Sequence, residues 1–564
     1  MIEGEIPFEQ PVKLCYLDVE GDVKDFLKQY WKWAKKTSEE SHGLEQWLGE
    51  LFQILPYPLT VIYEPYYVDS VYRDEYYRYY SSKHFELSRN CERLTFIHGK
   101  YKMTDFLSEK NEIHSEIEQN FIGSVVLKPT GNVGRTLLDP YKLGINAYIR
   151  TTRFRESVLG RDYFLSAFPS SGQDIEFMTC AEVNVWQTLE FFGRRYGEYK
   201  VVLPSEMLDI LQDSREVNIL PSDGLSTEQE AYLFMRNGFV PKVYNRFCML
   251  EGKPPIPEDK PKVQEERLIE LEDRLSALEG KLTVWVERAY DDMAFAAIMH
   301  FYVESGIPVL VNLRDKYDPT GDNHSVTCIG HERREMQAED FSKGEISLDI
   351  SDEKHYNFTV IPSWCQYDKY VIMEDHSVPY QLKRIEEMSF GNGENVIRWE
   401  VDSFVVPLFK HVYMPAEDAY DIFRELLYTT GDQVNQTLDV DSNAAVIRIY
   451  LTASRAFKDF RVGNATGIEE RLYYSQVTYP EYLWVCEYGT PKSYAGHRIR
   501  GEFILDATAS KCGTLDSVIA IRHGRNVTYR GPNEKGEFAF SYRKNIALAE
   551  EYSMFEHNNL NNKS

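Results

Sequence analysis

The chain has 564 residues, a mass of 65.9 kDa and a formal net charge of −26. One hydrophobic core does not normally organise a chain of this length, so we expect about two or three domains. The excess negative charge argues against nucleic acid or an anionic membrane as the main partner, because both attract a basic surface.

Several further classes of protein are disfavoured by simple features of the sequence. Met1 to Pro11 does not resemble a secretory signal, and no apolar run reaches the roughly 18 residues that a membrane span needs. The eight cysteines lie far apart without a Cys-x-x-Cys pair, which argues against disulfides and a zinc knuckle and favours the cytoplasm. We find no Gly-rich phosphate loop and no His/Cys spacing typical of a metal site.

Residues 1–155 are predicted to form an N-terminal α+β accessory domain. Amphipathic patterns predict helices over Lys24–Lys35 and Gly43–Leu55. Runs of β-branched and aromatic residues predict strands over Leu59–Glu64 and Phe121–Pro129. Further strands are expected between Gly144 and Phe168.

A polar loop beginning at Gln173 leads into a predicted helix at Cys180. Val185, Leu189 and Phe192 recur at helical spacing, and Thr179 is a suitable N-cap residue. Cys180 would then lie in the first turn of the helix. There the unpaired backbone N–H groups and the helix dipole favour a thiolate over a thiol.

The predicted catalytic domain covers residues 156–398 and contains two insertions. The first, at about 262–290, carries a leucine stripe from Leu268 to Leu282, which predicts either a helix packed on its own domain or a homodimer or partner contact. The second, at about 332–356, is acidic. The other elements predicted in this part of the chain are a helix over Met293–Ser305 and strands over Ile307–Leu313, Asn323–His331 and Tyr370–Asp375.

Residues 399–555 are predicted to form a C-terminal α+β accessory domain. It is expected to begin with a strand over Val401–Leu408 and a helix over Ala416–Thr430, followed by several strands. The Asn-rich tail, residues 556–564, is expected to be disordered.

Three side chains that suit nucleophilic catalysis occur at predicted element boundaries. Cys180 opens a helix, His324 begins a strand and Asp375 ends the next strand. A thiol needs a base, and the base needs a partner that orients its ring. The oxyanion of a tetrahedral intermediate needs hydrogen-bond donors, which the Cys180 backbone N–H and the Gln173 amide can supply.

Other residues of these elements are expected to have other roles. Alternation along a strand places Glu374 on the face opposite Asp375, so it is the weaker orienting candidate. His331 lies seven residues along the strand from His324. It is therefore expected on the face opposite His324 and is not the expected base. Cys328 is expected in the core, and Trp186 and Phe191 are expected to pack the helix.

These motifs resemble those of the papain-like cysteine peptidase superfamily, and most closely its bacterial bacteriocin-leader-processing members. The matching residues are Gln173, Cys180, Gly306–Val309, His324–Val326 with Gly330, and Asp375. The resemblance covers about residues 170–385. It implies a papain-like core, in which a helix bearing cysteine packs on a small antiparallel sheet bearing histidine and aspartate, and it implies a thioester intermediate without metal or cofactor.

The function expected from these features is a cytoplasmic cysteine hydrolase, acting as a peptidase or isopeptidase on a peptide or protein substrate. The triad would comprise Cys180, His324 and Asp375, with Gln173 in the oxyanion hole. Two alternatives stay open. The same residues support acyl transfer of the transglutaminase type, and an inactive papain-like protein would serve as an interaction or sensor module.

Overall fold

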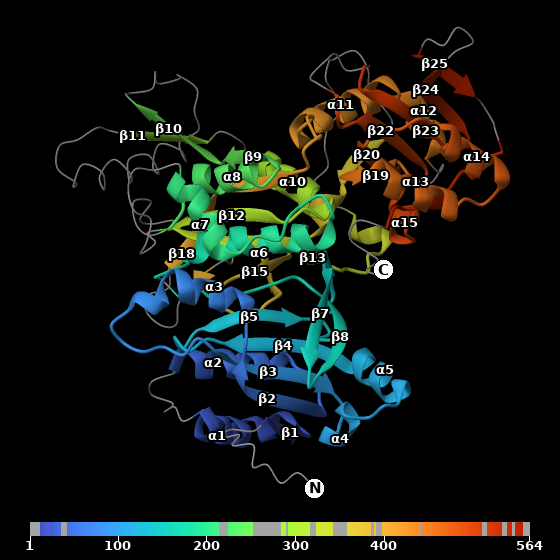
Figure 1. The fold of residues 1–564 in the computed structure, drawn as a ribbon. Helices are drawn as coiled ribbons and strands as arrows, with labels where there is room; N and C mark the ends of the chain where they lie inside the picture. Colours follow the sequence, from blue (N-terminus) through green and yellow to red (C-terminus); the bar gives the residue numbers. More distant parts are fainter. Residues whose placement is uncertain are drawn as a thin grey trace.

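The computed structural model describes most of the chain as a mixed α+β protein with several sheets (Figure 1). The described residues are 12–34, 42–174, 176–213, 224–251, 284–288, 292–315, 323–341, 358–384, 389–390, 397–438, 442–509, 516–532, 538–543 and 547–556. The leucine stripe Leu268–Leu282, most of the acidic insertion and most of the tail lie outside them. Within the described residues, no helix has the length and apolar character needed to cross a membrane.

The N-terminal part is built on a five-stranded antiparallel sheet in the order β1-β2-β3-β4-β5. Its strands are β1 (Lys13–Leu17), β2 (Leu59–Tyr67), β3 (Cys91–His98), β4 (Phe121–Leu127) and β5 (Val133–Leu138). Its helices are α1 (Val23–Ala34), α2 (His42–Ile54), α3 (Ser70–Arg78), α4 (Met103–Phe106) and α5 (Asn111–Asn120). The predicted elements over residues 24–35, 43–55, 59–64 and 121–129 are therefore confirmed.

Both faces of this sheet are covered. Along β2, Val61 joins the apolar cluster that contains α1 and α2, whereas Ile62 joins a cluster with the hairpin of β7 (Thr152–Val158) and β8 (Arg161–Ala167). This alternation follows from the two-residue repeat of a strand. Because the hairpin packs on β4 and β5, the N-terminal packing unit extends beyond the boundary expected at residue 155.

The central sheet contains the strands next to which the candidate site residues lie. Its order is β16-β15-β13-β12-β18-β17, with β6 also paired to β13 and β9 to β18. The strands are β6 (Ala147–Ile149), β9 (Val240–Asn245), β12 (Val309–Asp315), β13 (His324–Glu332), β15 (Tyr370–Met373), β16 (Gln381–Lys383), β17 (Ser389–Phe390) and β18 (Ile397–Leu408). The helices are α6 (Cys180–Arg195), α7 (Pro204–Asp213), α8 (Thr227–Arg236) and α10 (Asp292–Glu304). Outside this sheet, β10 (Phe247–Glu251) pairs with β11 (Val284–Arg288).

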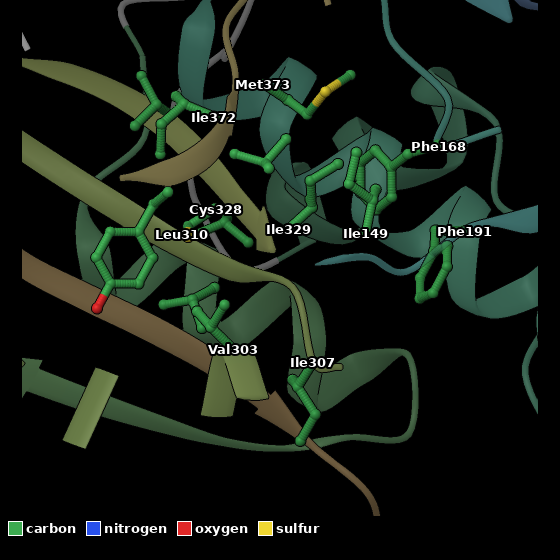
Figure 2. Close-up of a cluster of buried hydrophobic side chains, with 14 of the residues drawn as sticks. Ile149, Phe168, Phe191, Val303, Ile307, Leu310, Cys328, Ile329, Ile372 and Met373 are labelled. Carbon is green, nitrogen blue, oxygen red and sulfur yellow. The ribbon is translucent and has the colours of Figure 1, made fainter. Parts of the chain in front are cut away.

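Apolar side chains from several of these elements meet around β13 (Figure 2). Cys328 and Ile329 of β13 lie among Leu310 of β12 and Ile372 of β15. Cys328 is fully buried, and burial raises the pKa of its thiol to about 12. The prediction that Cys328 belongs to the core is confirmed. Trp186 and Phe191 of α6 are buried in the same apolar cluster, as predicted.

The C-terminal part contains a seven-stranded sheet in the order β14-β19-β20-β22-β23-β24-β25. Its strands are β14 (Thr359–Pro362), β19 (Ala444–Ala453), β20 (Tyr482–Gly489), β22 (Gly501–Asp506), β23 (Val518–His523), β24 (Asn526–Pro532) and β25 (Phe538–Arg543); the short β21 (Arg498–Ile499) pairs with β26 (Tyr552–Ser553). Its helices are α11 (Ala416–Thr429), α12 (Gly431–Thr437), α13 (Ser454–Gly463), α14 (Ile468–Gln476) and α15 (Pro491–Ala495).

Two strands cross the domain boundaries that the sequence suggested. β18, expected to open the third domain, pairs with β12 and lies inside the central sheet. β14 follows the acidic insertion and pairs in parallel with β19 of the C-terminal sheet. Hydrophobic patterns locate strands but do not say which sheet a strand joins, because pairing depends on contacts between distant segments.

Candidate active site

Helix α6 begins at Cys180, as predicted. Thr179 is its N-cap residue, and the carboxylate of Glu182 accepts a hydrogen bond from the Thr179 backbone N–H at 3.1 Å. Cys180 therefore occupies the first helical position, where backbone N–H groups point outward without intrahelical partners. Its side chain is half-buried, unlike the fully enclosed Cys91, Cys328 and Cys486.

A buried polar network fixes α6 against β13. Gln187 donates to the Thr327 hydroxyl at 2.9 Å, and Thr327 donates to Asn184 at the same distance. Asn184 lies one turn beyond Cys180, and Thr327 lies three residues beyond His324. These hydrogen bonds fix the position of α6 relative to β13, and they give partners to Asn184 and Gln187, two polar residues of α6 that are buried.

The N-terminal domain organises the loop before Cys180. Asp174 accepts hydrogen bonds from the backbone N–H groups of Phe177 and Met178, at 2.8 and 3.0 Å. The ammonium of Lys128 lies 3.8 Å from Asp174 and 2.7 Å from Glu75, and all three side chains are buried. Lys128 follows β4, so this ion cluster ties the loop to the N-terminal sheet.

His324 begins β13 and contacts the cysteine. Its imidazole interacts electrostatically with the side chain of Cys180, and its Nε2 lies 3.5 Å from a carboxylate oxygen of Glu374. The ring also packs against the indole of Trp399, with centroids 5.8 Å apart. The structure thus brings together the two residues that were predicted as nucleophile and base.

The surroundings of His324 favour its charged form. Burial alone lowers the pKa of this imidazole, but the contacts with Cys180 and Glu374 and the charge of Asp375 outweigh burial. The net effect raises the pKa of His324 to about 10. A charged imidazole beside a cysteine at a helix start is the arrangement that base-assisted activation of a thiol requires.

Glu374, rather than Asp375, makes the ion pair with His324. The prediction that Glu374 faces away is wrong because β15 ends at Met373. Strand alternation therefore does not govern the two residues that follow. Ser377 donates a hydrogen bond to Glu374 at 2.9 Å, and despite burial the contacts with His324 and Lys383 lower the pKa of Glu374.

Asp375 is also buried near His324, but its surroundings differ from those of Glu374. Neither of its carboxylate oxygens has a hydrogen-bond partner among the described residues. Burial raises its pKa, although the charges of His376 and His324 act in the opposite direction. Asp375 therefore contributes an electrostatic interaction to His324, whereas Glu374 contributes the shorter contact.

The Gln173 side chain contacts His376, which was not among the predicted site residues. The Gln173 amide hydrogen-bonds to Nε2 of His376, and the His376 ring lies roughly parallel to that of His324, with centroids 6.1 Å apart. The acidic pair Glu374-Asp375 followed directly by histidine is a sequence signal that would have drawn attention to this position.

The raised pKa of His324 predicts how stability depends on pH. The folded pKa of about 10 exceeds the ordinary value of 6.5, so protonation of His324 stabilises the fold fully below about pH 6.5 and not at all above pH 10. The difference in unfolding free energy between the wild type and His324→Gln should therefore shrink between these limits. Chemical denaturation at several pH values measures it, with exposed His411→Gln as control. A difference that grows with pH would contradict the proposed contacts.

Comparison with known proteins does not assign the chain to a family. No protein-family model matches the chain, and no curated protein matches it in sequence.

Proposed function

We propose that this protein is a cysteine-dependent hydrolase of papain-like type that cleaves an amide or thioester bond. The observation that carries the proposal is the contact of one imidazole, His324, with both a helix-start cysteine and a buried carboxylate. Nucleophile, acid-base group and orienting carboxylate then form one connected unit. The packing of α6 on the antiparallel strand β13 supports a papain-like core.

The proposed reaction begins from the thiolate–imidazolium pair. The Cys180 sulfur attacks the substrate carbonyl carbon, and the electron pair moves to the carbonyl oxygen. His324 then gives its proton to the leaving nitrogen as the C–N bond breaks, which leaves a thioester. Water attacks this thioester while His324 accepts its proton, and the C–S bond breaks to restore the thiolate. The backbone N–H of Cys180 is the first candidate donor to the oxyanion.

Gln173 is the second candidate donor to the oxyanion. Its amide contacts His376, so a role in the oxyanion hole would require substrate to attract the amide from that partner. Peptides and isopeptide-linked proteins are the proposed substrate class. Acyl transfer to an amine uses the same thioester, and product analysis with and without an added primary amine separates the two outcomes.

Selective alkylation of Cys180 tests the proposal. At about pH 5.5, some three units below an ordinary thiol pKa of about 8.5, only about 0.1% of an unperturbed thiol is ionised. Because Cys180 is proposed to react as a thiolate at this pH, iodoacetamide should modify it at least about 100-fold faster than Cys365. Cys365 is also half-buried, and burial raises the pKa of its thiol. Peptide mass spectrometry over time gives both rates in one sample.

The matched variant His324→Gln should bring the Cys180 rate down toward that of Cys365. Equal and slow labelling of both cysteines in the wild type would refute the hydrolase proposal and favour a non-catalytic interaction or sensor protein.

A further inference from the structure

Three side chains with metal-binding chemistry meet on α10 and β13, away from Cys180 in the sequence. His300 and Glu304 lie one turn apart on α10, and His331 lies near the end of β13; all three are buried. One donor atom from each lies within 4.8 Å of the other two. We propose that these residues bind a divalent transition-metal cation of the zinc class.

The geometry directs three donor atoms toward a common point. Residues four apart share one face of a helix, so His300 and Glu304 project together toward β13. His331 Nε2 lies 2.7 Å from Glu304 Oε2, and His300 Nε2 lies 3.5 Å from the same oxygen. Bonds to zinc of about 2.0–2.1 Å place the donors of a tetrahedral site about 3.3 Å apart. Small side-chain movements therefore suffice to admit the ion.

The atoms that face away from this point are already held in place. His331 Nδ1 hydrogen-bonds to the Glu332 carbonyl at 2.9 Å, and His300 Nδ1 contacts the Tyr370 hydroxyl at 3.1 Å. The other carboxylate oxygen of Glu304 accepts from Arg448 Nε at 2.6 Å. Partners of this kind orient the ligands of metal sites, because they fix the tautomer of each imidazole and the rotation of the carboxylate.

One of the three donor atoms is otherwise orphaned. Apart from the 3.5 Å contact with Glu304, Nε2 of His300 has no hydrogen-bond partner within the described part of the chain, and His300 is only 1% exposed. A buried polar nitrogen without a partner is unfavourable. A metal ion would supply that partner without requiring any additional hydrogen-bond acceptor.

The surroundings favour one class of cation and leave room for a further ligand. Imidazole nitrogens suit zinc and similar transition metals, whereas Mg²⁺ and Ca²⁺ prefer sites made of oxygen atoms. A cavity of about 30 Å³, lined in part by Glu304, Arg448 and Tyr367, adjoins the cluster. It is large enough for a water molecule next to Glu304.

The position of the cluster suggests a structural role. Arg448, which holds Glu304, belongs to β19 of the C-terminal sheet, and α10 packs on both β19 and β13. A bound ion would therefore strengthen the contact between the central and C-terminal sheets. Because a ligand that binds only the folded state stabilises it, zinc should raise the thermal unfolding temperature of the metal-depleted protein.

The sequence signal for this site is a His-x-x-x-Glu pair on a helix together with a distant histidine. A search for closely spaced histidines and cysteines does not detect it, because only folding brings β13 beside α10. The proposal is independent of the hydrolase function, since none of its ligands contacts Cys180 or His324 in the interactions described above.

The test uses the full-length chain carrying Cys180→Ser, so that the candidate nucleophile does not bind the metal. After metal depletion, the protein is titrated with Zn²⁺ by calorimetry and with Co²⁺ by visible absorption. We expect one ion per chain, Co²⁺ d–d bands without a thiolate charge-transfer band, and a rise in unfolding temperature. His300→Gln and His331→Gln should each lose the binding.

The matched control is His523→Gln. His523 is also buried, contacts a tyrosine hydroxyl and has an Nε2 without a hydrogen-bond partner among the described residues, but it is not part of the three-residue cluster. Its replacement should leave binding unchanged. If the Cys180→Ser chain binds no ion, or if both cluster variants keep the ion while folded by circular dichroism, the proposal is overturned. If the cluster variants do not fold, binding of one ion by the Cys180→Ser chain supports the proposal, and absence of binding overturns it.

Discussion

Replacement of Glu374 by glutamine is expected to slow the alkylation of Cys180 at pH 5.5 by about 10- to 100-fold. The reason is that an opposite charge within about 4–6 Å typically shifts a pKa by about one to three units in favour of the charged form, and this carboxylate stabilises the His324 imidazolium. Loss of the carboxylate should also shift the pH profile of alkylation toward higher pH. Rates measured across pH 5–9 on the folded variant test both effects.

Asp375→Asn is the matched comparison for Glu374→Gln. Asp375 influences His324 only through its charge and has no hydrogen-bond partner among the described residues, so we expect a smaller decrease in rate. The substitution should also cost little stability, because burial disfavours the charge of Asp375 and the substitution breaks no hydrogen bond of its carboxylate to the described residues. The reverse ranking, with Asp375→Asn the more damaging, would return the orienting role to Asp375, as the sequence alone predicted.

Replacement of Lys128 by methionine is expected to reduce both stability and the reactivity of Cys180. Lys128 is the cation between Glu75 and Asp174, and its loss leaves two buried carboxylates without their counterion. Breaking a buried ion pair in this way typically costs about 3–5 kcal/mol. Because Asp174 also holds the backbone of Phe177 and Met178, the loop before Cys180 should lose order, and alkylation should slow.

Two further variants test whether the effect of Lys128→Met is specific to this ion cluster. Lys142→Met removes a different lysine of the same domain, which is half-buried and donates to backbone carbonyls at 2.9 and 3.1 Å. This change should leave Cys180 reactivity unchanged. Glu75→Gln combined with Lys128→Met should recover part of the stability by removing one uncompensated charge. Unchanged alkylation in a destabilised Lys128→Met chain would show that the ion cluster supports the fold without ordering the loop.

Features that depend on neighbouring residues could be predicted from the sequence. The start of α6 at Cys180 follows from its N-cap residue and from helical periodicity. The start of β13 at His324 and the buried strand at Val309 follow from β-branched runs. In each case the signal lies within a few residues of the element that it predicts.

Errors arose where a position depended on distant contacts or on where an element ends. Extending the strand through Asp375 assigned Glu374 to the wrong side, although β15 stops at Met373. A boundary at residue 398 separated β18 from β12, with which it pairs. The contact of His376 with Gln173 was not predicted, because it joins residues 203 positions apart.

The sequence by itself determined the residue types available for chemistry and the starts of the elements that carry Cys180 and His324. Capping and periodicity are local, so they can be read from a short stretch of chain. Only the tertiary structure decided which carboxylate meets His324, how Lys128 supports the loop before Cys180, and that His300, Glu304 and His331 converge. Those relations arise when packing brings distant segments together and buries their charges, and no local pattern encodes them.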